Sequence, residues 1–337
     1  MEATGCNSPW SAAPVVHHPR AARPDSRDSC SRCLARGPLA PSAMVVMGVA
    51  PRGRPEGCRD FQRQLPGGPS IRIALAVALL VLSSCAAAVK APHLVTPPDP
   101  RVEDLSAFFG GFEATFVLLD LQRQELTRFN PERAARRQPP CSTFKVPNAL
   151  IGLETGVLSG PEHAMKWDGT HYEIETWNQD QTLRTAIRWS VVWYFQRVAA
   201  SIGEQRMRQY LHAIPYGNED ISGGLTRFWL DTSLLISADE QVDFMRRLAV
   251  GGLPFSVSSI ETVRELLRLR ETERGLLRGK TGTAGGSASH AALGWFVGYV
   301  QHAGNSFAFA TNIEGPGANG IRAREIAEEI LKHKGLL

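Results

Sequence analysis

The spacing of apolar residues changes along residues 91–337, from strand-like at the start to helical in the middle and back to strand-like before a last helix. Alternation with a period of two predicts strands, and a period near 3.6 predicts helices. We therefore expect strands at 113–121, 125–129, 293–301 and 306–313, helices in most of 160–275, and a closing helix at 321–334. Because strands stand at both ends and helices between them, the ends must meet in one sheet.

Helix boundaries are also visible in the sequence. The segment 183–214 predicts two or three helices broken at Ser190 and Gly203. A second helix at 237–249 opens with a capping box, and 259–270 predicts another amphipathic helix. The expected fold class is α/β, more narrowly α+β: an antiparallel sheet flanked by helices, with a helical subdomain inserted between the N- and C-terminal strands.

Residues 1–70 differ from the rest of the chain. They contain ten of the 22 prolines and show little hydrophobic periodicity. Such a composition buries too little apolar surface to offset the entropy of ordering. This segment is either disordered or an extension from a start site placed too early, since Met44 and Met47 lie downstream.

Residues 71–90 have the layout of an export signal. Arg72 precedes the apolar run 73–82, which is followed by small residues. The run is too short to span a bilayer comfortably. Leu82 to Cys85 also fits a lipoprotein cleavage box, and a simple cut within 86–88 is the alternative. We expect an exported, periplasmic protein, held at a membrane only if Cys85 is lipidated.

Charge and cysteine content narrow the functional classes. The net charge is +4, but residues 1–88 carry +5, so the remainder carries −1. A near-neutral body gives no reason to expect nucleic-acid binding. Cys141 is the only cysteine after the leader, which excludes a disulfide framework there. We see no metal-ligand cluster, phosphate loop or dinucleotide fingerprint, and the sequence does not indicate an oligomeric state.

Ser142 and Lys145 are the first candidates for chemistry. At positions i and i+3 of a helix start they share a face, and a helix N-terminus offers free backbone N–H groups. A serine hydroxyl becomes a good nucleophile only when a base takes its proton. Lysine is such a base only when it is neutral or modified, which requires desolvation.

A second motif, Lys280-Thr281-Gly282, opens the late strand block after a turn-prone Arg278-Gly279. At a strand start it places a cation and a hydroxyl along a cleft edge, where they suit a substrate carboxylate. The glycine allows a close backbone approach. The combination of S-x-x-K and K-T-G is typical of penicillin-recognising serine enzymes.

Four ordered motifs carry a closer resemblance. They are Ser142-Thr143-Phe144-Lys145, Ser190-Val191-Val192, Tyr216-Gly217-Asn218 and Lys280-Thr281-Gly282. With "KWDG", "WNQDQTL" and "FWLD" between them, residues 100–337 resemble a class D β-lactamase, or oxacillinase. The resemblance implies a catalytic domain at 91–337 with the serine β-lactamase/transpeptidase-like fold, acting on β-lactam antibiotics.

The resemblance also implies a role for each site residue. Ser142 would be the nucleophile, and Lys145, carbamylated by carbon dioxide, the general base; no other cofactor and no metal would be needed. Ser190 would relay a proton, with Lys280, to the leaving nitrogen. The carbamate pocket would consist of Phe144, Val192, Trp229 and Leu230. The substrate would be bound by Thr281, Gly282, Thr283 and by Arg322 or Arg324.

Two positions depart from the family pattern, and two other readings remain. The residue after K-T-G is Thr283, where the family often has a bulky apolar residue, and both Arg322 and Arg324 lie where the family has one arginine. A β-lactam sensor or a penicillin-binding domain would acylate without turnover. Val192, which stands where transpeptidases commonly carry asparagine, argues against a transpeptidase, and the chain lacks the H-E-x-x-H protease motif of the sensors.

Overall fold

A computed structural model describes residues 101–230, 233–285 and 291–337. The predicted segments 1–70 and 71–90, with Cys85, lie outside the described residues, as does the start of the predicted catalytic domain. In the described part of the chain, no helix is long and apolar enough to cross a membrane.

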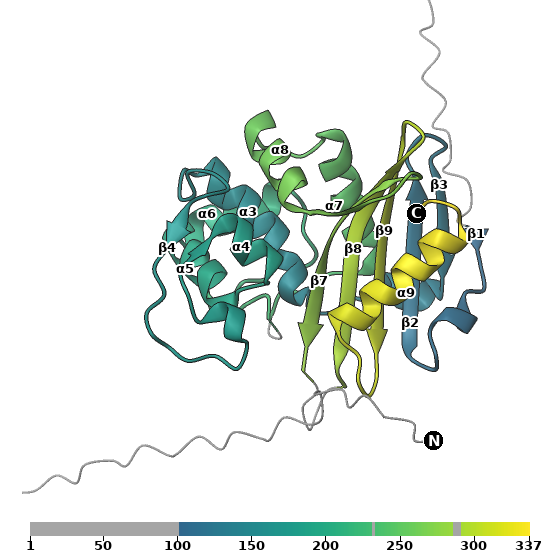
Figure 1. The fold of residues 1–337 in the computed structure, drawn as a ribbon, viewed down its shortest axis with the longest axis horizontal. Helices are drawn as coiled ribbons and strands as arrows, with labels where there is room; N and C mark the ends of the chain where they lie inside the picture. Colours follow the sequence, from purple (N-terminus) through teal and green to yellow (C-terminus); the bar gives the residue numbers. More distant parts are fainter. Residues whose placement is uncertain (1–100, 231–232, 286–290) are drawn as a thin grey trace, which may run out of the picture. The chain divides into compact units, whose positions relative to one another are not determined.

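Seven strands form one sheet in the order β1-β3-β2-β9-β8-β7-β6 (Figure 1). Their bounds are β1 Arg101–Val102, β2 Glu113–Asp120, β3 Glu125–Phe129, β6 Arg268–Glu271, β7 Leu276–Ala284, β8 Leu293–His302 and β9 Asn305–Glu314. The neighbouring strands pair antiparallel, as predicted, except β1 and β3, which pair parallel, so the sheet is mixed at this edge.

The first and last parts of the domain meet at the pair β2–β9. This pairing extends from Glu113 opposite Glu314 to Asp120 opposite Phe307. It confirms the prediction that the terminal strands form a single sheet. Because adjacent antiparallel strands exchange hydrogen bonds along their length, the pairing holds the two ends of the domain together.

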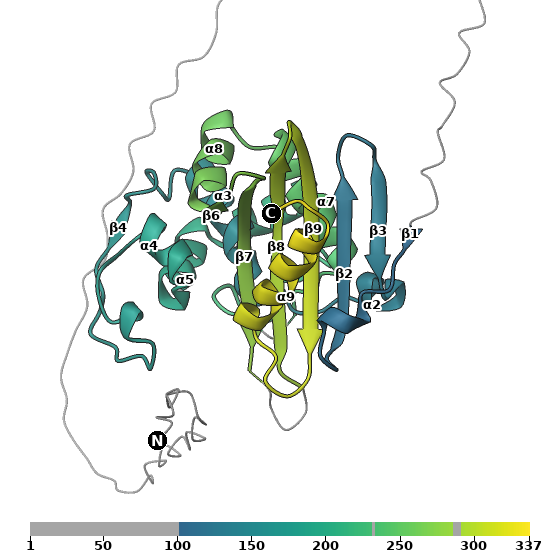
Figure 2. The same ribbon diagram turned by 45° about the vertical axis from the view of Figure 1, so that its right-hand side comes forward.

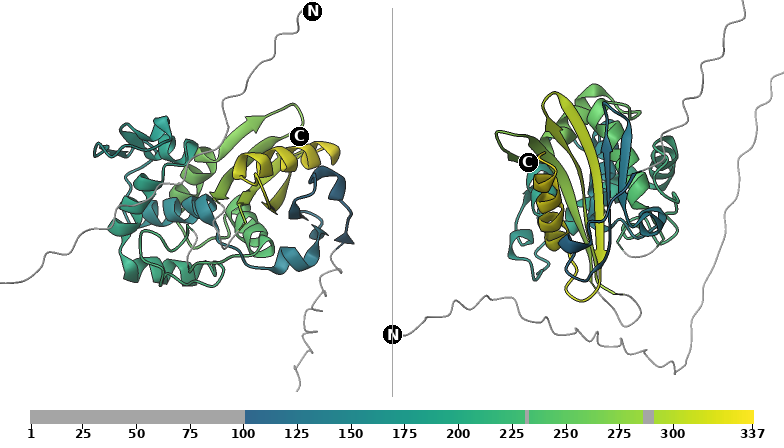
Figure 3. Two further views of the ribbon diagram at one scale, coloured as in Figure 1. Left: turned by 90° about the horizontal axis from the view of Figure 1, so that it is seen from below. Right: turned by 90° about the vertical axis from the view of Figure 1, so that its right-hand side faces the viewer.

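Successive side chains of each strand point to opposite faces of the sheet, and each face is buried. In β8, Phe296 and Val300 pack with α9 (Gly320–His333), whereas Trp295 and Tyr299 pack with the helical region. Figures 2 and 3 show α9 against one face and α7 (Ala238–Val250) with the other helices behind the opposite face.

The helical region begins with a short 3-10 turn. Its elements are η2 Cys141–Phe144, α3 Lys145–Glu154, α4 Leu183–Arg188, α5 Val192–Ile202, α6 Glu204–Ala213 and α8 Val257–Leu266. The breaks between α4, α5 and α6 fall at Ser190 and Gly203, as predicted, and both residues have positive φ. The predicted capping box of α7 is also present. Three small elements complete the fold: η1 Ser106–Phe108, α2 Pro131–Ala135 and η3 Glu175–Trp177.

Two predictions about this region were wrong. The helix expected at 259–270 ends at Leu266, and the next residues form the edge strand β6. The stretch 160–182 is mostly irregular rather than helical, with only η3 and the short strand pair β4 (Ala164–Met165) and β5 (Gln181–Thr182).

Candidate active site

The nucleophile candidate lies in the 3-10 turn η2 rather than in the first turn of an α-helix. Lys145 is the first residue of α3, and its Nζ lies 2.6 Å from Ser142 Oγ, to which it donates a hydrogen bond. The turn is anchored by Thr143, whose hydroxyl donates to Pro140 O and accepts from Gln241 Nε2. The hydroxyl and the amine are therefore held in direct contact by local structure.

Lys145 is completely buried. Burial is the main cause that holds the pKa of its amine well below the ordinary lysine value, and the nearby charge of Lys280 lowers it further. A lowered pKa favours the neutral amine, whose lone pair can take a proton. The amine of Lys145 is thus desolvated, as a lysine that acts as a base must be.

Aromatic side chains form the wall around this amine. Phe144 stacks on Trp229 with ring centres 5.4 Å apart, and the ring of Phe195 lies 5.8 Å from Lys145 Nζ. Val192 and Leu230, also predicted for this shell, are half-buried. Sequence reasoning missed Phe195; its position one helical turn after Val192 would have been the signal.

The indole N–H of Trp229 is buried and has no hydrogen-bond partner among the described residues. A buried donor without a partner costs about 1–3 kcal/mol, and native structures contain few of them. Trp229 packs against Phe144, which directly precedes Lys145, so this unsatisfied N–H belongs to the same buried part of the site.

Ser190 and Lys280 are brought together from positions 90 residues apart. Lys280 Nζ donates to Ser190 Oγ at 2.9 Å and to Thr281 O at 3.0 Å. Burial lowers the pKa of Lys280 to about 7. Ser190 has φ +57°, a left-handed conformation that non-glycine residues adopt rarely and often at functional sites.

Two tryptophans fix the turn that carries Ser190. Trp177 Nε1 donates to the main-chain oxygen of Trp189 at 3.0 Å. Trp193 Nε1 in turn donates to the main-chain oxygen of Trp177 at 3.0 Å. The loop containing η3 is thereby fastened to both sides of the strained serine.

The K-T-G motif lies within β7 rather than at its start, and the expected turn at Arg278-Gly279 is part of the same strand. A β-carbon added to Gly282 would lie 2.9 Å from Pro140 O and 3.3 Å from the main-chain nitrogen of Ser142. The glycine thus permits the close approach of β7 to the nucleophile turn. The side chain of Thr283 accepts a hydrogen bond from Gly320 N at the start of α9.

The motif Tyr216-Gly217-Asn218 packs against Phe144, beside the nucleophile turn. The Tyr216 ring is buried and lies edge-on to Phe144. Gly217 has φ +61°, and a β-carbon there would lie 2.0 Å from Leu235 O. Asn218 bonds the main chain of the segment that precedes α7. These contacts give the motif a structural role.

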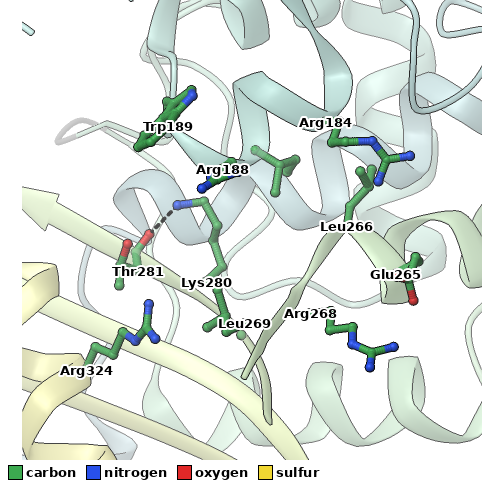
Figure 4. Close-up of a pocket in the computed structure, with 12 residues that line it drawn as sticks. Arg184, Arg188, Trp189, Glu265, Leu266, Arg268, Leu269, Lys280, Thr281 and Arg324 are labelled. Atoms are coloured by element: carbon green, nitrogen blue, oxygen red, sulfur yellow. Dashed lines mark hydrogen bonds between the residues drawn. The ribbon is translucent and has the colours of Figure 1, made fainter. Parts of the chain in front are cut away.

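A pocket of about 660 Å³ opens beside Lys280 and Thr281 (Figure 4). Its lining residues are Arg184, Ile187, Arg188, Trp189, Glu265, Leu266, Arg268, Leu269, Gly279, Lys280, Thr281 and Arg324. Of the two candidate arginines, only Arg324 lines the pocket. Arg322 instead pairs with Glu325 at the exposed start of α9.

Most of the basic lining was missed by the sequence reasoning. Arg184 and Arg188 are four residues apart and so share a face of α4, which was a readable signal. Arg268 was assigned to a helix and is in β6. In the described part of the chain, no group of three His, Cys, Asp or Glu residues could hold a metal ion.

Known proteins are similar to this chain in sequence and in fold. A family model described as the penicillin binding protein transpeptidase domain matches residues 115–332. The probable β-lactamase YbxI of Bacillus subtilis (strain 168) is 43% identical over 229 residues, or 68% of this chain and 84% of YbxI. The class D β-lactamase BAT-2, a solved structure, has a TM-score of 0.66 and 43% identity, covering 70% of this chain and 97% of its own.

A regulatory relative is about as similar in sequence. The regulatory protein BlaR1 of Bacillus licheniformis is 44% identical over 238 residues, which is 69% of this chain but only 39% of BlaR1. The family model, by contrast, covers more than half of this chain, and the match to YbxI extends over most of YbxI. The chain therefore belongs to the penicillin-binding transpeptidase family and, within it, to the class D β-lactamases, a group of hydrolases.

Proposed function

We propose that this chain hydrolyses the amide bond of β-lactam antibiotics through an acyl-enzyme on Ser142. The observation that carries the proposal is the 2.6 Å contact between Ser142 Oγ and the amine of a fully buried Lys145. A nucleophile in contact with a neutral base is the minimal requirement for serine acylation.

Acylation follows from these positions. Lys145 takes the proton of Ser142, and Oγ attacks the lactam carbonyl carbon. The main-chain N–H groups of Ser142 and Thr283 would stabilise the oxyanion, because β7 packs against the nucleophile turn at Gly282. As the C–N bond breaks, the nitrogen takes a proton from Ser190, which regains one from Lys280 at 2.9 Å, and the proton that Lys145 removed from Ser142 balances this loss. A water molecule then attacks the acyl carbon and loses a proton to the base, and Ser142 Oγ leaves and takes up that proton.

The residues around Lys145 fit a lysine carbamate formed from carbon dioxide. Carbamylation needs a neutral amine, and the buried N–H of Trp229 would donate to the new group, which Phe144, Val192 and Leu230 would shield from water. When present, the group supplies an anionic general base. This base would serve in acylation, when Ser142 loses its proton, and again in the second half of the reaction, in which water must lose a proton.

The carboxylate of the substrate would bind in the pocket beside Lys280. Thr281 and Arg324 line the pocket beside Lys280, where they would hold the ring carboxylate of the substrate. Between the two alternatives from the sequence, pocket lining favours Arg324 over Arg322. Charge-assisted hydrogen bonds of this kind fix the orientation of the lactam carbonyl toward Ser142.

The test is steady-state hydrolysis of a chromogenic cephalosporin, with and without added bicarbonate, by the parent protein and by Lys145→Ala. Sustained turnover that rises with bicarbonate and disappears in the variant is the expected result. Parent-like turnover by Lys145→Ala would refute the role of this lysine.

The 44% identity to a regulatory protein favours one alternative, a β-lactam sensor or penicillin-binding domain that acylates without turnover. Mass spectrometry of the protein after one equivalent of substrate distinguishes the two. A stable adduct on Ser142 with a single stoichiometric burst of product would favour the alternative, and regenerated free enzyme would favour hydrolysis.

Export to the periplasm is part of the proposal and rests on residues 71–90 alone. The N-terminal mass of protein recovered from the cell envelope would test it. A diacylglycerol mass on Cys85 would indicate lipidation, and a free N-terminus within 86–88 would indicate a simple cut.

A further inference from the structure

The pocket beside Lys280 holds more positive charge than a single carboxylate requires. Its basic residues are Arg184, Arg188, Arg268, Lys280 and Arg324, against one lining carboxylate, Glu265. They come from α4, β6, β7 and α9, so the concentration of charge is a product of the fold rather than of one basic segment.

The arginines differ in how far their charge is neutralised. Three have acidic partners: Arg184 pairs with Glu162, Arg268 with Glu271 and Arg324 with Glu328. Arg188 has no acidic partner among the residues that the structure describes. Its guanidinium lies 4.9 Å from the ring centre of Trp189, whose side chain is 41% exposed. Arg188 is therefore a free cation fixed at the pocket wall.

The two ends of the pocket have different relations to the reaction. In Figure 4, Arg188 and Arg324 reach toward Lys280 and Thr281, whereas Arg184 and Arg268 lie across the pocket. The ring carboxylate is assigned to Thr281 and Arg324. That assignment leaves Arg188 on α4 without an anion to bind, whereas Arg184 on the same face pairs with the exposed Glu162.

We propose that the face of α4 formed by Arg184 and Arg188 binds a second acidic group of the substrate. The inference rests on the proposed function, and it predicts a preference for β-lactams with an acidic substituent on the ring atom next to the carboxylate-bearing carbon. Exposed Trp189 and Leu269 add apolar surface to the same pocket, which suits an acid joined to the ring by an apolar linker.

The test compares two cephalosporins that differ only in this substituent, one ending in a carboxylate and one in its amide. The rate of acylation of Ser142 at low substrate is measured for the parent, Arg188→Gln and Arg208→Gln. Arg208 is the matched control, an exposed arginine of α6 that pairs with Glu204 and does not line the pocket.

We expect the ratio of the acid rate to the amide rate to fall about three- to tenfold in Arg188→Gln, because a charge-assisted contact is lost, and to stay at the parent value in Arg208→Gln. An unchanged ratio in Arg188→Gln would overturn the inference. The same would follow if added salt failed to reduce the ratio in the parent, since a partly exposed ion pair is screened.

A second measurement separates this inference from the proposed function. Inorganic pyrophosphate, a compact polyanion, is titrated calorimetrically into the same three proteins. If neither cephalosporin acylates Ser142, the proposed function fails, and the calorimetry alone decides whether α4 is an anion site. Binding that weakens several-fold only in Arg188→Gln supports the site, and equal binding by all three proteins refutes it.

Discussion

Replacing Trp229 by phenylalanine should raise the bicarbonate concentration that the enzyme needs for half of its maximal turnover. The substitution keeps an aromatic ring in the stack with Phe144 and removes the buried indole N–H. If that N–H donates to a carbamate on Lys145, its loss weakens the carbamate and leaves the neutral amine unaffected. The variant therefore distinguishes a carbamate donor from an ordinary core tryptophan.

The magnitude follows from the burial of the donor. A hydrogen bond to a charged group contributes about 1.5–3 kcal/mol, which corresponds to about a 10- to 150-fold weaker affinity for carbon dioxide. Without carbon dioxide the donor is unsatisfied at a cost of about 1–3 kcal/mol, so its removal offsets much of the loss from the smaller ring. In carbon dioxide-free buffer, parent and variant should have nearly equal free energies of unfolding.

Three measurements check this reasoning. Turnover is titrated with bicarbonate, the carbamate is counted by its ¹³C NMR signal after labelling with ¹³C-bicarbonate, and stability is measured by denaturant unfolding in carbon dioxide-free buffer. Phe228→Leu is the control, because Phe228 packs edge-on against Trp229 and has no polar atom. It should lose stability without a comparable change in bicarbonate affinity.

A bicarbonate titration and a ¹³C signal of Trp229→Phe that match those of the parent would refute a carbamate donor at Trp229. So would a Phe228→Leu variant whose bicarbonate requirement shifts as much as that of Trp229→Phe. In that event packing around Lys145, rather than the indole N–H, would determine carbamylation.

Three further predictions concern other parts of the site. Because burial lowers the pKa of Lys280 to about 7, the unfolded chain binds more protons than the folded chain between pH 7 and about 10.4. The free energy of unfolding should therefore rise from pH 7 to pH 9, by up to about 1.4 kcal/mol per pH unit from this group, and rise less in Lys280→Met. Trp177→Phe removes the hydrogen bond from the indole N–H to the main-chain oxygen of Trp189, which fixes the turn that carries Ser190. In steady-state kinetics this variant should have a kcat about tenfold lower with little change in KM. A kcat equal to that of the parent would contradict this positioning role. Gly217→Ala should cost at least about 2 kcal/mol in denaturant unfolding, because its β-carbon would lie 2.0 Å from Leu235 O at positive φ; a cost below 0.5 kcal/mol would contradict the geometry.

Local signals predicted most of the elements. The breaks at Ser190 and Gly203, the capping box of α7 and the strand pair β8–β9 all follow from nearby residues, and the structure confirms them. The strand β6 was missed because the pattern of 259–270 satisfies a helical period throughout. All four residues of β6 are exposed, so its identity depends on hairpin pairing with β7 rather than on burial.

The sequence motifs predicted the residues at the centre of the candidate site. Ser142 and Lys145 are close in sequence, and the resemblance predicted that Ser190 and Lys280 would meet, which they do at 2.9 Å. The position of Lys280 within its strand was wrong because Gly279 looked like a turn residue. A β-carbon at Gly279 would lie 2.8 Å from the Phe296 ring, so this glycine serves packing between strands.

The basic pocket was not predictable in the same way. Its arginines lie on elements far apart in the sequence, and no spacing rule relates α4 to β6 or α9. Only folding shows that they share one cavity. For the same reason, only the direction of each side chain at the start of α9 shows that Arg324 lines the pocket and that Arg322 does not.

The pairing of β2 with β9 has a consequence for biosynthesis. Strand β9 pairs with β2 on one side and with β8 on the other, so β2 has no neighbour on that side until residues 305–314 have been added. A growing chain contains Ser142 long before it contains Lys280. Because long-range pairings form slowly and only after both strands exist, the sheet that positions these two residues forms only after β9 has been translated.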